Sequence, residues 1–376
     1  MAKSAIVIGG GVAGITISHL LSEKGWDVTL LEKNGHLGGG FKTFYYGGHP
    51  YTYGPRPLIS RNESETGVFE FVNKFTPLRK LDHNLLTYVE HDGQFYSYPI
   101  HEDDIPRMPD ADKIYAELEE IENIPQRKPE NFEEYWLGKV GPSLYEKFIN
   151  TYSKKMWQVS SNKEITDFAW SPKGAALKSG PRSVSFSNEN IIGYPYAHDG
   201  YDAYFEKATQ DVKVRLNSAP DKYDLDKKRV LVNNEWISGD IIVNTISLDV
   251  IMNNAFGKLP YVGRDFIKLV LPAEEILPEG VQFIHYSGDE IYTRVVEYKK
   301  LTFHKSPTTL LVIEIPSSNG KLYPLPVAEP QALAQRYKNA LPKDVYTIGR
   351  IGSYIYNIDF DGLIIQCFNF MKQLDE

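Results

Sequence analysis

The feature that most constrains the fold is a glycine-rich turn close to the start of the chain. Residues 5–8 are apolar, residues 9–14 read Gly-Gly-Gly-Val-Ala-Gly, and a helical pattern runs on to Gly25. A second apolar run over residues 28–31 stops at Glu32. Strand, glycine turn, helix, strand and acid follow one another in the order that a dinucleotide site requires. The sequence therefore predicts a βαβ unit that binds a dinucleotide.

Each glycine of this turn has a separate physical task. Gly9 permits the tight turn, Gly11 lets backbone N–H groups approach a pyrophosphate, and Gly14 lets the helix lie close to the strand. The helix N-terminus then faces the anion with its positive dipole end. Glu32 follows Gly14 by eighteen residues, where it can accept hydrogen bonds from an adenosine ribose.

A second glycine cluster narrows the choice of cofactor. Glu32 and Lys33 are followed by Gly38, Gly39 and Gly40, and this segment resembles the E-K-x-x-x-x-G-G pattern of FAD proteins rather than that of NAD dehydrogenases. Glycines here supply a further stretch of bare backbone beside a bulky cofactor. We therefore expect FAD, with Lys33, Gly39 and Gly40 among the residues that bind it.

Composition excludes several classes of protein. The net charge of −8 argues against nucleic-acid binding as the main role. No apolar stretch approaches the roughly 20 residues needed to span a bilayer, and the chain enters its first strand directly, so we expect neither a membrane span nor a signal peptide. The single cysteine, Cys367, excludes an intramolecular disulfide and favours the cytoplasm. The nine histidines lack metal-ligand spacing, so no metal site is predicted.

The fold class predicted is α/β: a Rossmann-like FAD-binding domain with a helical insert and an antiparallel β-sheet domain. We assign the discontinuous FAD-binding domain to residues 1–80, 196–245 and 344–376. Residues 102–195 form the helical insert and a mobile loop, and residues 81–101 with 246–343 form the substrate domain. Helices are expected over residues 111–121, 131–157, 331–340 and about 360–374, with helix starts at Asn131 and at the Gly141-Pro142-Ser143 segment. Strands are expected over residues 212–216, 229–232, 236–242, 281–286, 291–298 and 309–315, and residues 240–245 should return to the first sheet.

Three further segments resemble one family, the UDP-galactopyranose mutases. Residues 145–157 are similar to its Y-E-x-F-x-x-x-Y-x-x-K-x-W helix, residues 292–297 to its Y-T-R-x-x-E strand, and residues 349–356 to its G-R-x-G-x-Y-x-Y segment. The matches occur in the correct order and, with the N-terminal unit, span nearly the whole chain.

The resemblance implies roles for particular residues. Arg294 and Arg350 would contact the diphosphate and the cofactor region, and Tyr323 and Tyr356 would grip the diphosphate through their hydroxyl groups; these four are the candidate catalytic residues. Phe148 and Tyr152 would hold the base and Trp157 would help form the sugar pocket. His101, Tyr194 and Lys178 complete the predicted substrate-binding set.

The chain also departs from the family pattern near the flavin. After Tyr53-Gly54-Pro55 the family usually continues H-I-F-H, whereas this chain has Arg56-Pro57-Leu58-Ile59. Arg56 can supply a positive charge near the flavin N1–C2 region. His101 stands where the family has Asn. The arginine of the family's mobile loop, expected within residues 168–182, has Lys173, Lys178 and Arg182 as candidate replacements.

The function implied is interconversion of pyranose and furanose forms of a nucleotide sugar, through an adduct between N5 of reduced FAD and the sugar. UDP-galactose or a close relative is the first substrate to consider, and a dTDP- or UDP-linked deoxy- or N-acetyl sugar is the alternative. A flavin amine oxidase-like oxidoreductase and a nucleotide-binding protein without activity are the other interpretations. The resemblance also implies a homodimer, an external reductant and a product destined for polysaccharide synthesis.

Overall fold

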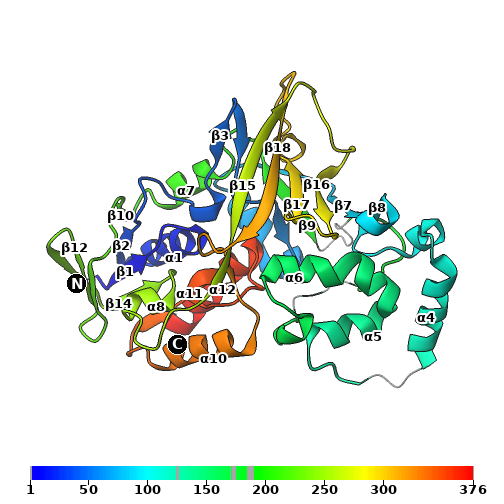
Figure 1. Cartoon of the computed structure of the whole chain (residues 1–376). Helices are drawn as coiled ribbons and strands as arrows, with labels where there is room; N and C mark the ends of the chain where they lie inside the picture. Colours follow the sequence, from blue (N-terminus) through cyan, green and yellow to red (C-terminus); the bar gives the residue numbers. More distant parts are fainter. Residues whose placement is uncertain (1, 124–126, 170, 172–174, 184–189, 376) are drawn as a thin grey trace.

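The computed structural model describes residues 2–123, 127–169, 171, 175–183 and 190–375 (Figure 1). At its centre lies a five-stranded parallel sheet in the order β10-β2-β1-β14-β20. Its strands are β1 (Ser4–Ile8), β2 (Asp27–Leu31), β10 (Lys213–Arg215), β14 (Ile241–Asn244) and β20 (Val345–Thr347). As predicted, residues 240–245 return to this sheet. Strand β20, near the end of the chain, completes it, so the sheet is built from both ends of the sequence.

Two layers cover this parallel sheet. Helices α1 (Val12–Glu23) and α12 (Phe360–Asp375) pack against each other on one face. On the other face, Val230 and Val232 pack with Ile6, Ile8 and Ile242. Both valines belong to a small antiparallel sheet of β11 (Lys222–Asp224), β12 (Arg229–Val232) and β13 (Glu235–Ser238). The sheet is thus buried on both faces, which explains its nearly continuous apolar strands.

A seven-stranded sheet stands beside this unit in the order β19-β15-β18-β17-β16-β7-β8. Its strands are β7 (Asn84–Val89), β8 (Gln94–Tyr98), β15 (Tyr261–Leu271), β16 (Val281–Tyr286), β17 (Arg294–Glu297), β18 (Thr309–Ser317) and β19 (Tyr323–Pro324). The predicted antiparallel sheet is therefore present, with one parallel pair, β16 with β7. Because nearly 200 residues separate these two strands, no hairpin fixes their relative direction.

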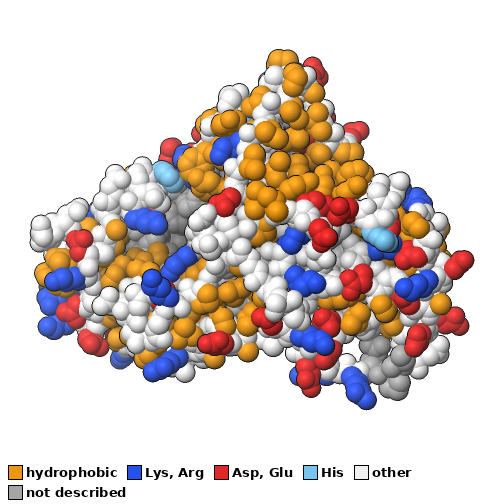
Figure 2. Space-filling model, in the orientation of Figure 1, with side chains coloured by type: hydrophobic (Ala, Val, Ile, Leu, Met, Phe, Trp, Pro, Cys, Tyr) orange, Lys and Arg blue, Asp and Glu red, His pale blue; other side chains and the backbone are white. Residues whose placement is uncertain are grey.

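The outer face of the seven-stranded sheet carries exposed apolar side chains. Figure 2 shows them gathered at the top of the molecule, where β15 and β18 lie in Figure 1. Ile267 and Leu269 of β15 are 46% and 42% exposed. Side chains alternate along a strand, so Phe266 and its opposite neighbour Glu314 project from the other face, toward the interior.

Two smaller sheets join the parts. One has the order β5-β9-β6, and the other pairs β3 with β4. Their strands are β3 (Phe44–Tyr46), β4 (His49–Tyr51), β5 (Leu58–Ser60), β6 (Leu78–Lys80) and β9 (Ile191–Pro195). β9 falls within the range predicted for the helical insert, yet it is a strand that pairs with β5 and β6 of the N-terminal segment.

The predicted helical insert holds most of its helices between residues 102 and 157. It contains α4 (Ala111–Asn123), α5 (Phe132–Tyr145), the π-helix η4 (Glu146–Asn150) and α6 (Thr151–Trp157). The Asn131 side chain accepts a hydrogen bond from the Glu134 N–H at 3.0 Å, which confirms the predicted helix start. At Gly141 the φ angle is +78°, so the helix is interrupted where the sequence predicts a second start.

Short helices connect these elements. They are η1 (Gly39–Phe41), α2 (Glu63–Thr66), α3 (Val68–Asn73), η2 (Glu90–Asp92), η3 (Glu102–Arg107), η5 (Asn162–Glu164), α7 (Asp202–Ala208), α8 (Leu248–Ile251), α9 (Lys299–Thr302), α10 (Ala328–Asn339) and α11 (Gly349–Gly352). Among the described helices, none has both the length and the apolar character that crossing a membrane requires. Cys367 is buried in α12.

Candidate active site

Two glycine segments lie side by side as bare backbone at the carboxyl end of β1. The N–H of Gly38 donates to the carbonyl of Gly10 at 2.8 Å, and Gly11 forms an isolated bridge with Gly38. At Gly11, no atom of the described residues lies within 4 Å of the place that a Cβ would take, apart from the adjoining backbone. We name residues 9–14 with 38–40 the glycine cradle. Its open backbone fits the pyrophosphate of a dinucleotide.

Close packing and a buried acid complete the cradle. A Cβ on Gly14 would lie 1.8 Å from the carbonyl oxygen of Gly9, so only glycine allows α1 to approach β1 this closely. Glu32 is 7% exposed and accepts hydrogen bonds from the N–H groups of Gly10 and Asn34 at 2.7 and 2.8 Å. Its carboxylate therefore lies at the edge of the cradle, with exposed Lys33 next to it.

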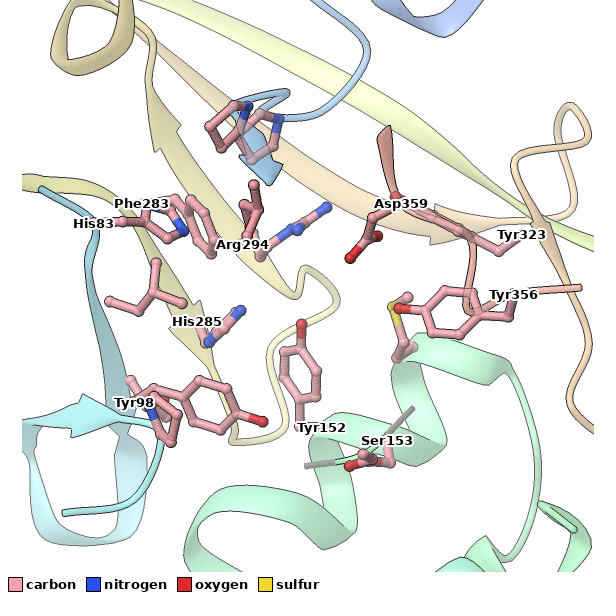
Figure 3. Close-up of a pocket in the computed structure, with 18 of the residues that line it drawn as sticks. His83, Tyr98, Tyr152, Ser153, Phe283, His285, Arg294, Tyr323, Tyr356 and Asp359 are labelled. Atoms are coloured by element: carbon pink, nitrogen blue, oxygen red, sulfur yellow. The ribbon is translucent and has the colours of Figure 1, made fainter. Parts of the chain in front are cut away.

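A large cavity lies between the segment that follows the glycine cradle, the seven-stranded sheet and the helical insert (Figure 3). Eight of the predicted site residues line it: Arg56, Phe148, Tyr152, Trp157, Arg294, Tyr323, Arg350 and Tyr356. They come from the β4–β5 connection, the insert, strands β17 and β19, and the segment around α11. Residues far apart in the sequence thus meet in one place.

Arg294 lies on β17 directly opposite Glu314 of β18. Its Nε and Nη2 donate to one carboxylate oxygen of Glu314 at 2.9 and 2.5 Å, and Glu314 is fully buried. Burial disfavours the charged form of Arg294, but Glu314, Tyr323 and Tyr152 together outweigh burial and hold the arginine pKa well above its ordinary value. The other oxygen of Glu314 has no hydrogen-bond partner in the described part of the chain. The guanidinium therefore stays charged at the cavity wall.

Arg350 is fixed by the segment that precedes α12. Its Nε donates to the carbonyl of Ile358 at 2.9 Å, and its Nη2 lies 3.1 Å from a carboxylate oxygen of Asp359. Its guanidinium carbon lies 5.6 Å from the ring centre of Tyr323 and 5.8 Å from that of Tyr356. The two predicted tyrosines and this arginine therefore form one group.

Tyr323 lies within a field of positive charge. Burial acts to raise the pKa of Tyr323, but the positive charges of Arg56, Arg294 and Arg264 together outweigh burial and lower this pKa to about 8. The guanidinium of Arg264 lies 4.8 Å from the Tyr323 ring. Arg264 is only 5% exposed, and its Nε has no hydrogen-bond partner among the described residues. This region thus holds more positive charge than its carboxylates neutralise, which suits a diphosphate.

Arg56 joins the cavity to the glycine cradle. It donates to the carbonyl of Tyr53 at 2.7 Å and stacks on Phe41 at 5.1 Å. A Cβ on Gly40 would lie 3.6 Å from its Nη2. Its buried Nε has no partner in the part of the chain that the structure describes. An unsatisfied donor beside the cradle fits an acceptor on a bound cofactor.

Aromatic side chains of the insert form the opposite wall. Phe148 lies in the π-helix and Tyr152 in the first turn of α6. Trp157 meets Tyr356 edge-on, with 4.6 Å between ring centres. Burial raises the pKa of Tyr152 to about 12, although Arg294 and Arg264 act against it. Its hydroxyl therefore remains protonated at neutral pH.

Three predicted substrate residues do not line this cavity. His101 donates from Nε2 to the carbonyl of Gly180 at 2.8 Å and accepts at Nδ1 from the N–H of Asp103, so it caps η3. The Lys178 Nζ donates to the carbonyls of Pro181 and Ser183, and burial lowers its pKa to about 8. Tyr194 is buried in β9 against Tyr201. Local hydrogen bonds and packing thus occupy all three.

The candidates for the mobile-loop arginine lie elsewhere. Arg182 pairs with Asp104 at 2.9 Å and contacts the hydroxyl of Ser97. Lys173 lies outside the described residues. Among those that are described, no group of three His, Cys, Asp or Glu side chains could hold a metal ion.

Four important residues were not in the predicted set. Tyr98, His285 and Asp359 line the cavity, and Arg264 lies behind Tyr323. Arg264 had a signal in the sequence, because it stands between apolar residues 262 and 266 at the inward-facing positions of a strand. His285 had one too, because it shares a strand face with Phe283. Neither signal shows a cavity without the strand pairing.

Comparison with known proteins fits this geometry. A family profile described as UDP-galactopyranose mutase matches residues 147–356, and one described as NAD(P)-binding Rossmann-like domain matches residues 7–75. The chain belongs to the UDP-galactopyranose mutase family. This is a family of mutases, so the chain is an isomerase, and its first matched segment is the dinucleotide-binding part.

Full-length relatives agree with this assignment. The chain is 26% identical to a dTDP-fucopyranose mutase of Escherichia coli, with 97% of each chain covered. It is 24% identical to a probable UDP-galactopyranose mutase of Klebsiella pneumoniae, over 100% of this chain and 94% of the relative. A solved structure of reduced UDP-galactopyranose mutase superposes with a TM-score of 0.83 at 17% identity, covering 99% and 95% of the two chains. That structure establishes the common fold.

Proposed function

We propose that this mutase interconverts the pyranose and furanose forms of a sugar carried on a nucleoside diphosphate. The observation that carries the proposal is the clustering of Arg56, Arg294 and Arg350 with two tyrosines in one cavity, opposite an aromatic helix face. Guanidinium groups bind phosphate oxygens in pairs and stay charged. Aromatic faces accept a nucleobase.

The charged wall would hold the leaving diphosphate. Arg294 and Arg350 would bind its oxygens, while Tyr323 and Tyr356 would donate their hydroxyl protons to it. Because Glu314 and Asp359 fix the two guanidinium groups in advance, little ordering is left to the moment of reaction. A diphosphate kept in place can return to the sugar after the ring has changed size. Phe148, Tyr152 and Trp157 would meanwhile hold the base and the sugar.

The cofactor proposed is FAD in its reduced state. Gly9, Gly11, Gly14, Glu32, Lys33, Gly39 and Gly40 would hold its dinucleotide part, with Arg56 and Arg350 beside the ring system. When bound, reduced flavin supplies a nucleophilic nitrogen for the anomeric carbon. The open space at Gly11 and the unpartnered Nε of Arg56 support this assignment.

UDP-galactose or a close relative is the substrate we propose first. A dTDP-linked deoxy sugar is the second candidate, because the relative with 26% identity is a dTDP-fucopyranose mutase. An external reductant would supply two electrons to the flavin. We further propose a cytoplasmic homodimer whose product serves polysaccharide synthesis; the single buried cysteine is compatible with that compartment.

A chromatographic assay tests the proposal. Purified, dithionite-reduced protein is incubated with UDP-galactose, UDP-N-acetylgalactosamine or dTDP-fucose, and with their furanose forms. We expect a new isomer of equal mass from one donor, formed only when the flavin is reduced. Absence of any isomer, with flavin reduction driven instead by an amine, would overturn the proposal in favour of an oxidase.

A further inference from the structure

Arg61, in the connection between β5 and α2, binds two acids at the start of α12. Its Nη1 donates to both carboxylate oxygens of Asp361 at 2.9 and 2.8 Å, and its Nη2 donates to one oxygen of Asp359 at 2.8 Å. The side chain of Asp361 is 4% exposed, whereas that of Arg61 is 43% exposed. A half-exposed guanidinium group therefore holds both acids in place.

Asp359 connects this arginine to the cavity. Its other carboxylate oxygen accepts a hydrogen bond from Nη2 of Arg350 at 3.1 Å. Figure 3 shows Asp359 on the side of the cavity where Tyr323 and Tyr356 lie. Asp359 and Arg350 line the cavity and Arg61 does not. One carboxylate is thus shared between a guanidinium group of the cavity wall and a second guanidinium group behind the wall.

Sharing of the carboxylate affects how firmly Arg350 is bound within the protein. Arg61 stays charged, because burial acts to lower its pKa but Asp361 and Asp359 outweigh burial and hold this pKa above its ordinary value. Without Arg61, both oxygens of Asp359 could turn to Arg350 in the paired geometry that guanidinium and carboxylate groups prefer. A diphosphate would then compete with Asp359 for the same donors.

Arg61 also holds the segment that orients Arg350. Two hydrogen bonds orient the guanidinium of Arg350, and their acceptors are the carbonyl of Ile358 and the carboxylate of Asp359. Both residues lie directly before α12, and Asp361 lies in the first turn of that helix. Arg61 therefore binds the segment at two points, and a planar guanidinium group with several acceptors has little freedom to rotate.

We propose that Arg61 is a positioning residue for the diphosphate site. It acts through Asp359, because it shares that carboxylate and holds the segment around it, and so it keeps Arg350 oriented and available to the substrate. This inference rests on the proposed contact between Arg350 and the diphosphate. It goes beyond that contact, since Arg61 itself lies outside the cavity.

A double-mutant cycle in ligand affinity tests the inference without relying on turnover. The holoenzyme is titrated calorimetrically with UDP and with dTDP, in about 0.3 M salt to screen charges that are not in contact. The proteins compared are the wild type, Arg61→Met, Arg350→Met and the variant with both changes. Arg229→Met is the matched control, since Arg229 also pairs with an acid, Asp224 at 2.9 Å, but belongs to the sheet of β11, β12 and β13.

We expect Arg61→Met to weaken binding of the tighter nucleotide by about tenfold when Arg350 is present. In the Arg350→Met background the same change should weaken binding by less than about threefold, because the group through which Arg61 acts is gone. Arg61→Lys keeps the charge but loses the planar fork, so its affinity should lie between those of the wild type and Arg61→Met. Arg229→Met should bind as the wild type does.

Two results would overturn the inference. An equal loss in both backgrounds would show a general disturbance of the fold, and full affinity in Arg61→Met would show that Arg350 does not depend on Arg61. If Arg61→Met does not retain flavin, Arg61→Lys takes its place in the cycle, with the same dependence on Arg350 expected. If the wild type bound neither nucleotide, the proposed function itself would fail, which is a different result.

Discussion

The glycine cradle and the charged cavity wall are held in place by different kinds of interaction. The cradle depends on backbone hydrogen bonds, such as Gly38 to Gly10, and on the absence of side chains. The wall depends on side chains that meet across strands and loops, such as Arg294 with Glu314 and Arg350 with Asp359. The cradle therefore has no room for a side-chain atom at its closest contact, between Gly14 and the carbonyl of Gly9. In the wall, side chains can be replaced while the backbone stays the same.

Adding one methyl group inside the cradle should have the largest effect. In Gly14→Ala the new carbon would overlap the Gly9 carbonyl, which is backbone and cannot turn away. We expect a loss of about 5 kcal/mol or more in the free energy of unfolding, or no folded protein. Urea denaturation of the wild type and the variant measures this difference in the free energy of unfolding.

Gly11→Ala is the matched control. Its φ angle is −79°, and beyond the adjoining backbone no atom of the described part of the chain lies within 4 Å of the new carbon, so stability should change by less than about 1 kcal/mol. Flavin content should nevertheless fall, because the methyl group takes space proposed for the pyrophosphate. Equal instability of the two variants would contradict this account of the cradle.

Breaking the buried ion pair of the wall should have the second largest effect. Arg294→Met leaves the fully buried carboxylate of Glu314 without its partner, and we expect a loss of about 3–5 kcal/mol. The double variant Arg294→Met/Glu314→Leu should recover most of this stability, since both charges are gone. Mutase activity should stay at least about 100-fold below wild type in both variants. Recovery of activity in the double variant would show that Arg294 is only structural.

Tyr323 gives the wall a pH dependence. With a pKa near 8 instead of 10, the folded protein releases this proton at a pH where the unfolded chain still holds it. Stability relative to Tyr323→Phe should therefore rise by about 2 kcal/mol between pH 8 and pH 10, and the gain should be absent below pH 8. Denaturation of both proteins at each pH measures the difference. A constant difference would mean that the arginines do not act on this phenol.

The smallest effect is expected at His101, outside the cavity. His101→Ala removes the cap of η3 and the bond to Gly180, and should cost about 1 kcal/mol. Because the ring does not line the cavity, affinity for UDP should be unchanged. A tenfold loss of UDP affinity with unaltered stability would restore His101 to the substrate site.

The sequence predicted best those features of the fold that depend on residues close together in the chain. The turn from Gly9 to Gly14 and the helix start at Asn131 depend on contacts within a few residues, and both were found. The parallel pairing of β7 with β16 depends on segments 200 residues apart, so neither the place of His285 nor the cavity face could be deduced. At His101, the family pattern suggested a substrate contact, but a backbone N–H two residues away occupies the ring nitrogen. Local capping competes with function at such positions.

The central claim is that the cavity releases the diphosphate from the sugar and gives it back. UDP-galactose labelled with ¹⁸O in the bond between sugar and diphosphate tests this most directly, by positional exchange in the reduced holoenzyme. We predict that the label moves into non-bridging positions, that oxidation of the flavin stops the exchange, and that Arg294→Met abolishes it. Formation of furanose product with the label still in its original bridge would contradict the account, because the sugar–oxygen bond would never have been broken.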